Sequence, residues 1–216
     1  MAMINQLVRK AKKLFTSTVS ATDVRNDYYY TRIYFKRILF FFRSYIEAQQ
    51  ENNIKHTDAP ISPLGLKFGS SPGTVKKELG IPKYIYDNEN DTHNHKVYFF
   101  RRTFTDISLL VQVQFYNNQL FFIGLDVIRR LINEDEKIAI INTVIQKYLN
   151  QPFTKGAAYP LIQDADKNFI IINDDINFSI CYLSGEIDDA KKENIIKAME
   201  KVLQEKPDKG SLFYAF

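Results

Sequence analysis

Apolar residues follow a helical spacing in two stretches near the N-terminus. In residues 4–15, apolar positions form one face and basic side chains the other, which is typical of a short amphipathic helix. A Ser/Thr-rich stretch at 16–22 ends this pattern. A second helical pattern starts at Thr22 or Asp23, which suit an N-cap, and runs to about Gln50. The sequence therefore predicts two N-terminal helices.

The second predicted helix is dense in aromatic rings, and its polar side chains gather in one narrow strip. That strip contains Arg25, Arg32, Lys36, Arg43, Glu47 and Gln50. The helix is therefore apolar over more than half of its circumference. Such a helix is either covered by its own domain on several sides or leaves one side for a partner.

In the middle of the chain, the spacing of apolar residues changes from helical to alternating. Ser71 and Pro72 suit the N-cap and first turn of a short helix, which Gly80 would end. Four runs with the character of β-strands follow, at 83–86, 96–102, 108–116 and 119–127. Asn117 and Asn118 suit a tight hairpin turn between the last two runs. We therefore expect a helix followed by a four-stranded antiparallel meander.

The second half of the chain repeats this order. Asn133 and Glu136 have the spacing of a capping box for a helix that ends near Leu149. Three more strands and a final helix are predicted, at 159–163, 168–173, 176–183 and 186–205. The expected fold class is α+β, with N-terminal helices, two tandem helix-plus-antiparallel-sheet units and a C-terminal helix. The expected segments are a helical segment at 1–50, a four-stranded unit at 51–130 and a three-stranded unit with the C-terminal helix at 131–216.

Residues 64–127 contain a short sequence motif around the first predicted helix of this region. Leu66-Lys-Phe-Gly69 precedes the first helix of the body, Gly80-Ile81-Pro82 closes it, and Phe-Tyr-Asn-Asn-Gln-Leu forms a later hairpin turn. On these residues, 64–127 resembles the small helix–sheet unit of the SmpA/OmlA and β-lactamase-inhibitor-protein-like families. The resemblance implies a non-catalytic protein that binds other proteins through a sheet face. Members of those families are typically exported or lipid-anchored, whereas this sequence shows no export signal, lipobox cysteine or disulfide pair.

Composition is that of a globular chain, and its charge is unevenly distributed. Of 216 residues, 45% are hydrophobic and 25% charged, which excludes wholesale disorder. Residues 1–50 contain nine Lys or Arg and three Asp or Glu, a net charge of +6, so residues 51–216 carry −2 of the total of +4. No uncharged apolar run reaches the ~20 residues that span a bilayer. With a lone cysteine, the sequence predicts a cytoplasmic protein, with the periphery of the inner membrane as the alternative location.

The residues that could carry chemistry form no convincing site. His93 and His95 are a weak metal candidate within a polar loop, and no further ligand is indicated by spacing. Residues 164–168 begin like a calcium loop, but the glycine and bidentate glutamate are missing, so a tight turn is the better interpretation. Cys181 lies in an alternating strand, where a buried, unreactive thiol is expected. No catalytic residue and no cofactor is predicted.

Function is therefore expected to lie in binding. We predict a non-catalytic interaction module of the inhibitor, immunity or adaptor type, which binds a protein partner or a second copy through a sheet face or the aromatic N-terminal helix. The candidate partner-binding residues are Tyr30, Tyr34, Phe40, Phe41, Phe213 and Phe216. The simplest competing interpretation is that both N-terminal helices pack on the body through their apolar sides.

Other classes of partner give different predictions. A peripheral membrane protein is the first alternative, held at an anionic surface by Arg9, Lys10, Lys12 and Lys13. An enzyme is the third hypothesis, although no residue pattern indicates one. Nucleic acid is disfavoured, because the cations of the second helix lie opposite its rings and bases could not stack beside them. No feature identifies a small-molecule ligand.

Overall fold

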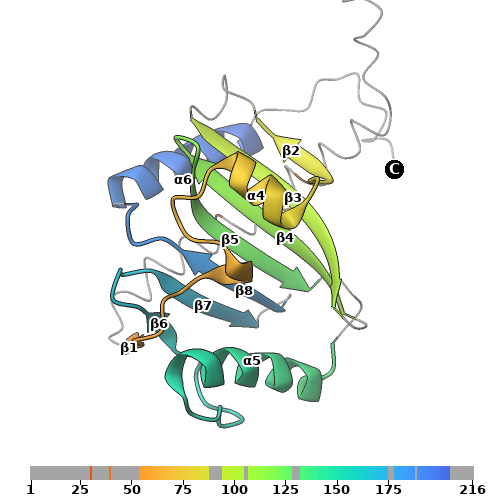
Figure 1. The fold of residues 1–216 in the computed structure, drawn as a ribbon, viewed down its shortest axis with the longest axis vertical. Coiled ribbons are helices and arrows are strands. Elements are labelled where there is room, and N and C mark those ends of the chain that lie inside the picture. The colour runs from red at the N-terminus through yellow and green to blue at the C-terminus, as the bar shows by residue number, and fades with distance from the viewer. Residues whose placement is uncertain are drawn as a thin grey trace, which may run out of the picture.

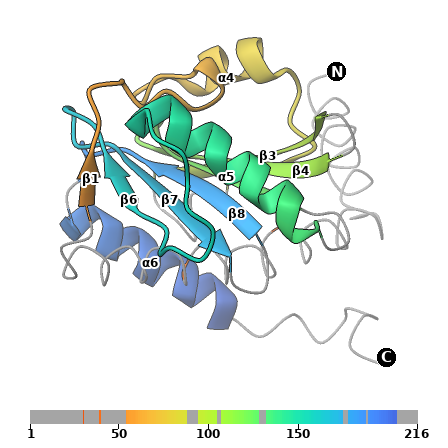
Figure 2. The same ribbon diagram turned by 90° about the horizontal axis from the view of Figure 1, so that it is seen from below.

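A computed structural model describes Tyr30, Leu39 and residues 54–87, 94–104, 107–127, 132–174, 178–187 and 189–204. Its centre is a single eight-stranded sheet with helices on both faces (Figure 1). The helices α4 (Pro72–Leu79) and α5 (Glu134–Leu149) cover one face, and α6 (Asp189–Gln204) lies on the other (Figure 2). The predicted α+β class is confirmed.

The strands join in the order β1-β6-β7-β8-β5-β4-β3-β2. Their bounds are β1 (Ile54–His56), β2 (Tyr84–Tyr86), β3 (His95–Phe104), β4 (Ile107–Tyr116), β5 (Gln119–Val127), β6 (Leu161–Gln163), β7 (Phe169–Asp174) and β8 (Phe178–Leu183). A short 3-10 turn, η2 (Pro63–Gly65), precedes α4. All neighbouring strands run antiparallel except β1 and β6, which are parallel.

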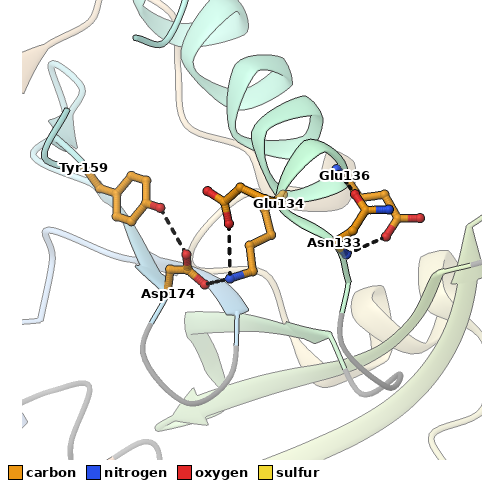
Figure 3. A network of polar contacts seen from close by, with 6 residues as sticks. Asn133, Glu134, Glu136, Tyr159 and Asp174 are labelled. Carbon is orange, nitrogen blue, oxygen red and sulfur yellow. Dashed lines mark hydrogen bonds and ion pairs between the residues drawn. The ribbon is translucent and has the colours of Figure 1, made fainter. Parts of the chain in front are cut away.

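The local signals in the sequence formed the expected elements. Strands β2 to β5 are an antiparallel meander, and both Asn117 and Asn118 have positive φ, as a tight hairpin turn requires. The capping box is complete, because Asn133 Oδ1 accepts the Glu136 N–H at 2.8 Å and Glu136 Oε2 accepts the Asn133 N–H at 3.0 Å (Figure 3). The Ser71 Oγ accepts the Thr74 N–H at the start of α4.

The two helix-then-sheet segments share one sheet. Strand β5 of the first segment pairs with β8 of the second, with Gly124 opposite Cys181. This contact places β5, β4 and β8 in the interior of the sheet, where Gln119 is the one exposed residue of these three strands. The sequence predicted strands in both segments but contained no signal for this pairing.

The short strand β1 lies in a polar stretch for which the sequence predicted no strand. Ile54 pairs with Leu161 in parallel, and the Thr57 N–H continues the ladder to the Gln163 oxygen at 2.9 Å. A three-residue strand with a single apolar residue has no period that reveals it. Its position is determined by β6, which lies far along the chain.

Each face of the sheet has its own apolar core. On the face of α6, Ile195, Ile196 and Met199 of that helix pack on strand residues that include Phe99 and Phe122. Tyr30 and Leu39 belong to this same core. The remainder of the two predicted N-terminal helices lies outside the described residues. No helix in the part of the chain that the structure describes is long and apolar enough to cross a membrane.

The second core includes the buried faces of the two other helices. Val75 and Leu79 of α4 and Ile141 and Ile145 of α5 pack on the opposite side of the same strands. Both faces of the central strands are therefore occupied by helices of the chain itself. This is why the strand β5 has apolar side chains at successive positions in the sequence, from Leu120 to Ile123, without alternation.

A polar network holds the start of α5 against the end of β7 (Figure 3). The ammonium of Lys137 lies 2.6 Å from Asp174 Oδ1 and 3.8 Å from a carboxylate oxygen of Glu134, and the Tyr159 hydroxyl donates to Asp174 Oδ2 at 3.2 Å. The hydrogen bond to Asp174 raises the pKa of Lys137, and burial raises the pKa of Tyr159. The network joins a helix, a strand and a loop at one carboxylate.

The Lys137→Met variant should lower the free energy of unfolding by about 1 kcal/mol, because Asp174 then keeps only the tyrosine hydroxyl as a described partner. Urea denaturation at low ionic strength measures this loss. The matched control is Lys155→Met in an exposed loop, for which a change within about 0.5 kcal/mol is expected. Equal losses for the two variants would contradict a specific role for the ion pair.

Candidate interaction surface

The end of the sheet at β2 is shaped by the way α4 stops. The Gly80 N–H donates to the Lys76 oxygen at 2.8 Å, and Gly80 has a positive φ of 74°, which a residue with a Cβ adopts only with strain. Pro82 cannot continue a helix, and the Lys83 N–H instead bonds to the Phe99 oxygen at 2.7 Å as β2 begins. Ile81 therefore lies at the apex of the turn between helix and strand.

Two isoleucines are exposed at this end of the sheet. Ile81 is 91% exposed and Ile85 is 40% exposed, and they are the large hydrophobic side chains that are exposed among the described residues. Ile85 pairs with Tyr98 of β3, so its side chain lies on the face of the sheet that carries α4. An isolated exposed apolar residue needs no explanation, but two on one turn and its strand indicate a contact surface.

Two cations have contacts with residues next to these isoleucines, and Lys83 is exposed two residues before Ile85. The Lys76 ammonium lies 5.1 Å from the centre of the Tyr98 ring, which is the ring opposite Ile85. The Arg102 guanidinium lies 5.8 Å from the centre of the Phe100 ring and donates to the Leu79 oxygen, two residues before Ile81. We define the α4–β2 surface as Lys76, Ile81, Lys83, Ile85 and Arg102.

The opposite face of β2 holds an aromatic cluster. The Tyr30 ring stacks on Tyr84 with centroids 5.0 Å apart and planes at 10°, and it meets Phe99 at the same distance and 42°. The Tyr30 hydroxyl accepts a hydrogen bond from Arg101 Nε at 3.4 Å. Tyr30 is only 5% exposed and Leu39 is also buried. A residue assigned to a partner surface from sequence thus lies in the core.

The other candidate residues in the terminal segments lie outside the described residues. These are Tyr34, Phe40, Phe41, Phe213 and Phe216, with the basic residues Arg9, Lys10, Lys12 and Lys13. Their assignment to a partner or membrane surface stays a prediction. Of residues 1–50, the structure describes Tyr30 and Leu39, and both belong to the core on the face of α6.

His95, one of the two weak metal candidates, is buried inside the sheet. Its side chain is on β3, and its Nε2–H donates to Gln114 Oε1 at 2.9 Å. Burial lowers the pKa of His95 to about 4, against a partial opposing effect of the Gln114 bond. His93 lies outside the described residues. Within the described chain, no group of three His, Cys, Asp or Glu residues is arranged to hold a metal ion.

Acid should destabilise the protein through His95. Because its pKa in the folded state lies below the usual 6.5, the unfolded chain takes up the proton first as pH falls. The stability due to the neutral imidazole is complete above pH ~6.5 and should decrease by roughly 2–3 kcal/mol by pH ~4.5. Urea denaturation at several pH values measures this slope. His95→Gln should remove its contribution, and an unchanged slope in that variant would contradict the assignment.

The remaining candidate groups have structural roles. Cys181 is buried, and burial followed by the nearby Asp126 charge raises the pKa of its thiol well above the usual value, the opposite of an activated nucleophile. The Asp164 carboxylate accepts the N–H groups of Ile61 and Asn168, both at 2.8 Å, together with the Asn168 amide at 3.0 Å. The predicted tight turn is confirmed by these bonds.

No pattern in the sequence predicted the α4–β2 surface. Ile81 belongs to the motif that ends the helix, and no role in binding was expected for it. The available signal was an apolar residue in a turn, directly before a proline and outside any helical or alternating pattern. An apolar residue in such a position need not be buried, so the sequence is compatible with an exposed Ile81. It does not indicate which side chains lie beside Ile81.

Comparison with known proteins identifies no relative. No family model, no curated protein and no solved structure matches the chain. The resemblance of residues 64–127 to the SmpA/OmlA and β-lactamase-inhibitor-protein-like unit is therefore tested by none of these comparisons and stays a prediction.

Proposed function

We propose that the protein is a non-catalytic interaction module that binds a protein partner through the α4–β2 surface. The observation that carries this proposal is the exposure of Ile81 at the apex of the turn, with Ile85 exposed on the adjoining strand. Protein interfaces are centred on apolar side chains that become buried on binding and are bordered by polar groups. The α4–β2 surface has that composition, with two isoleucines among three cations.

The arrangement of helices supports binding at the end of the sheet and not on one of its faces. Helices α4 and α5 cover one face of the described strands, and α6 with Tyr30 and Leu39 packs on the other. A partner that approaches a face would meet helices, whereas at β2 it meets exposed isoleucines. We therefore propose the β2 end of the sheet, including Ile85 on the face that carries α4, as the place where the partner binds.

The positions of the described reactive groups also support a binding role. Cys181 and His95 are both buried in the sheet, and the Asp164 carboxylate is used by backbone and side-chain N–H groups. These groups act in packing and turn formation. None of the three lies on the α4–β2 surface.

Photo-crosslinking tests the proposal in an extract of the source cells. A photoreactive amino acid replaces Lys77, which is exposed on α4 beside the surface, and in a control chain it replaces Lys155, exposed in a distant loop. We expect one discrete adduct from position 77 and none from position 155. Excess unlabelled protein should suppress the adduct, whereas excess Ile81→Asp/Ile85→Asp protein should not. Equal adducts from both positions, or suppression by the double variant, would overturn the proposal.

A peripheral membrane protein remains the second proposal, because residues 1–50 carry a net charge of +6. Flotation with vesicles of phosphatidylcholine containing phosphatidylserine measures it. Binding that requires phosphatidylserine and disappears on substitution of Arg9, Lys10, Lys12 and Lys13 by glutamine would support this function. No flotation of the full chain would exclude it.

A further inference from the structure

The charge of the α4–β2 surface restricts the kind of partner. Lys76, Lys83 and Arg102 contribute three positive charges, and Lys77 adds an exposed fourth on the last turn of α4. Glu78 is the exposed carboxylate beside them on that helix. Asp87, at the far end of β2, lies 2.9 Å from the Lys96 ammonium and is therefore engaged. The surface is basic, although residues 51–216 as a whole carry a net charge of −2.

Two of these cations are held in place by rings and by the backbone. Lys76 lies over Tyr98, the neighbour of Ile85, and Arg102 lies over Phe100 and bonds to the carbonyl that precedes Gly80. The guanidinium has five N–H donors in a planar fork, so one bond to a carbonyl leaves donors for a carboxylate. A partner that covers Ile81 and Ile85 must also remove water from these cations. Charged groups that lose water without a counter-charge oppose binding.

We propose that the partner is an acidic protein surface, in which carboxylates surround a small apolar pocket that receives Ile81. The inference rests on the proposed function and specifies the chemistry of its partner. Carboxylates opposite Lys76, Lys83 and Arg102 replace the water that these cations lose, and they steer the encounter over a distance of about one Debye length. Ile81 fills the pocket, and Ile85 contacts its border.

A protein surface suits this arrangement better than a lipid surface. Ile81 is at the apex of the turn, whereas Ile85 is on the strand and only partly exposed beside Tyr98. A planar bilayer would reach the apex alone, but a partner with a shaped surface can follow the turn onto the strand. Binding to a lipid surface is the alternative that the vesicle experiment below measures.

The test measures how the adduct from position 77 depends on charge. We expect the concentration of protein that gives half-maximal adduct to rise about tenfold between 50 and 500 mM NaCl, as for electrostatically steered complexes. In 50 mM NaCl, the double variant Lys76→Gln/Lys83→Gln should raise this half-maximal concentration to a similar extent. The control Lys155→Gln/Lys197→Gln makes the same change of charge at exposed positions elsewhere and should leave it unchanged.

The outcomes separate this inference from the proposed function. An adduct that depends on Ile81 and Ile85 but not on salt or on the two lysines would overturn the acidic partner and leave the binding function standing. The absence of a specific adduct would overturn both. Flotation with vesicles containing 30% phosphatidylserine, abolished by Ile81→Asp, would overturn the protein partner in favour of a lipid surface. Circular dichroism spectra like that of the parent chain establish that each variant is folded.

Discussion

Replacing Tyr30 by alanine is expected to lower the free energy of unfolding by about 3–5 kcal/mol, the range for removal of a buried aromatic ring. The Tyr30 ring is 5% exposed, stacks on Tyr84 and packs at a tilt against Phe99, so its loss leaves a cavity against two strands. Urea denaturation followed by circular dichroism measures the change as a lower midpoint with a similar slope.

The matched control is Tyr30→Phe. It keeps the ring and removes only the hydroxyl that accepts a hydrogen bond from Arg101 at 3.4 Å, so a loss of no more than about 1 kcal/mol is expected. If Tyr30→Ala has no more effect than Tyr30→Phe, the ring is not part of the core. The adduct from position 77 should persist in folded Tyr30→Ala protein, because Tyr30 is on the opposite face of β2 from Ile85.

The second large effect is expected at the turn between β6 and β7. Asp164→Ala should lower the free energy of unfolding by about 2–6 kcal/mol, because two buried backbone N–H groups lose their acceptor and each costs about 1–3 kcal/mol. Those groups belong to Ile61 and Asn168, so the loss separates the chain before α4 from the turn. Thermal or urea denaturation measures it.

The control for this prediction is Asp166→Ala in the same turn. Asp166 is exposed, so its removal should change stability by no more than about 0.5 kcal/mol. Calcium should not raise the melting temperature of the parent chain, since the Asp164 oxygens already accept N–H donors. A calcium-dependent increase that Asp164→Ala removes would contradict the structural role.

The turn between β6 and β7 limits the size of the side chain that can be accommodated at position 185. A Cβ added to Gly185 would lie 2.5 Å from the Lys167 oxygen and 2.6 Å from the Asp166 oxygen. The Gly185 N–H also donates to Asn168 Oδ1 at 3.1 Å. Glycine at 185 is therefore required by the close approach of two loops. No local motif involves residue 185, so a glycine at this position could not be predicted from the sequence.

Local interactions explain the parts of the fold that the sequence predicted. The capping box at Asn133 and Glu136, the N-cap at Ser71 and the two-residue turn at Asn117 and Asn118 each depend on neighbours within a few residues. Such features are encoded in short stretches, so they can be predicted without the rest of the chain. The meander of β2 to β5 follows from them, because short turns leave consecutive strands adjacent.

Only part of the α4–β2 surface could be predicted from such local interactions. The helix stop at Gly80 and Pro82 was predicted, and it determines where Ile81 stands in the chain. The positions of Lys76 over Tyr98 and of Arg102 at the end of α4 depend on packing of the helix on β3. No spacing in the sequence relates these side chains to the exposed isoleucines.

By itself, the sequence determined the α+β class, the helix caps, the hairpin and the positions of most strands, because each depends on contacts between near neighbours. Only the tertiary structure decided that β5 pairs with β8, that Ile54–His56 forms β1, that Tyr30 is buried and that Ile81 is exposed. These outcomes depend on pairing and burial between segments far apart in the chain. An apolar side chain is stabilised equally by its own core or by a partner, so its burial is decided by the complete fold.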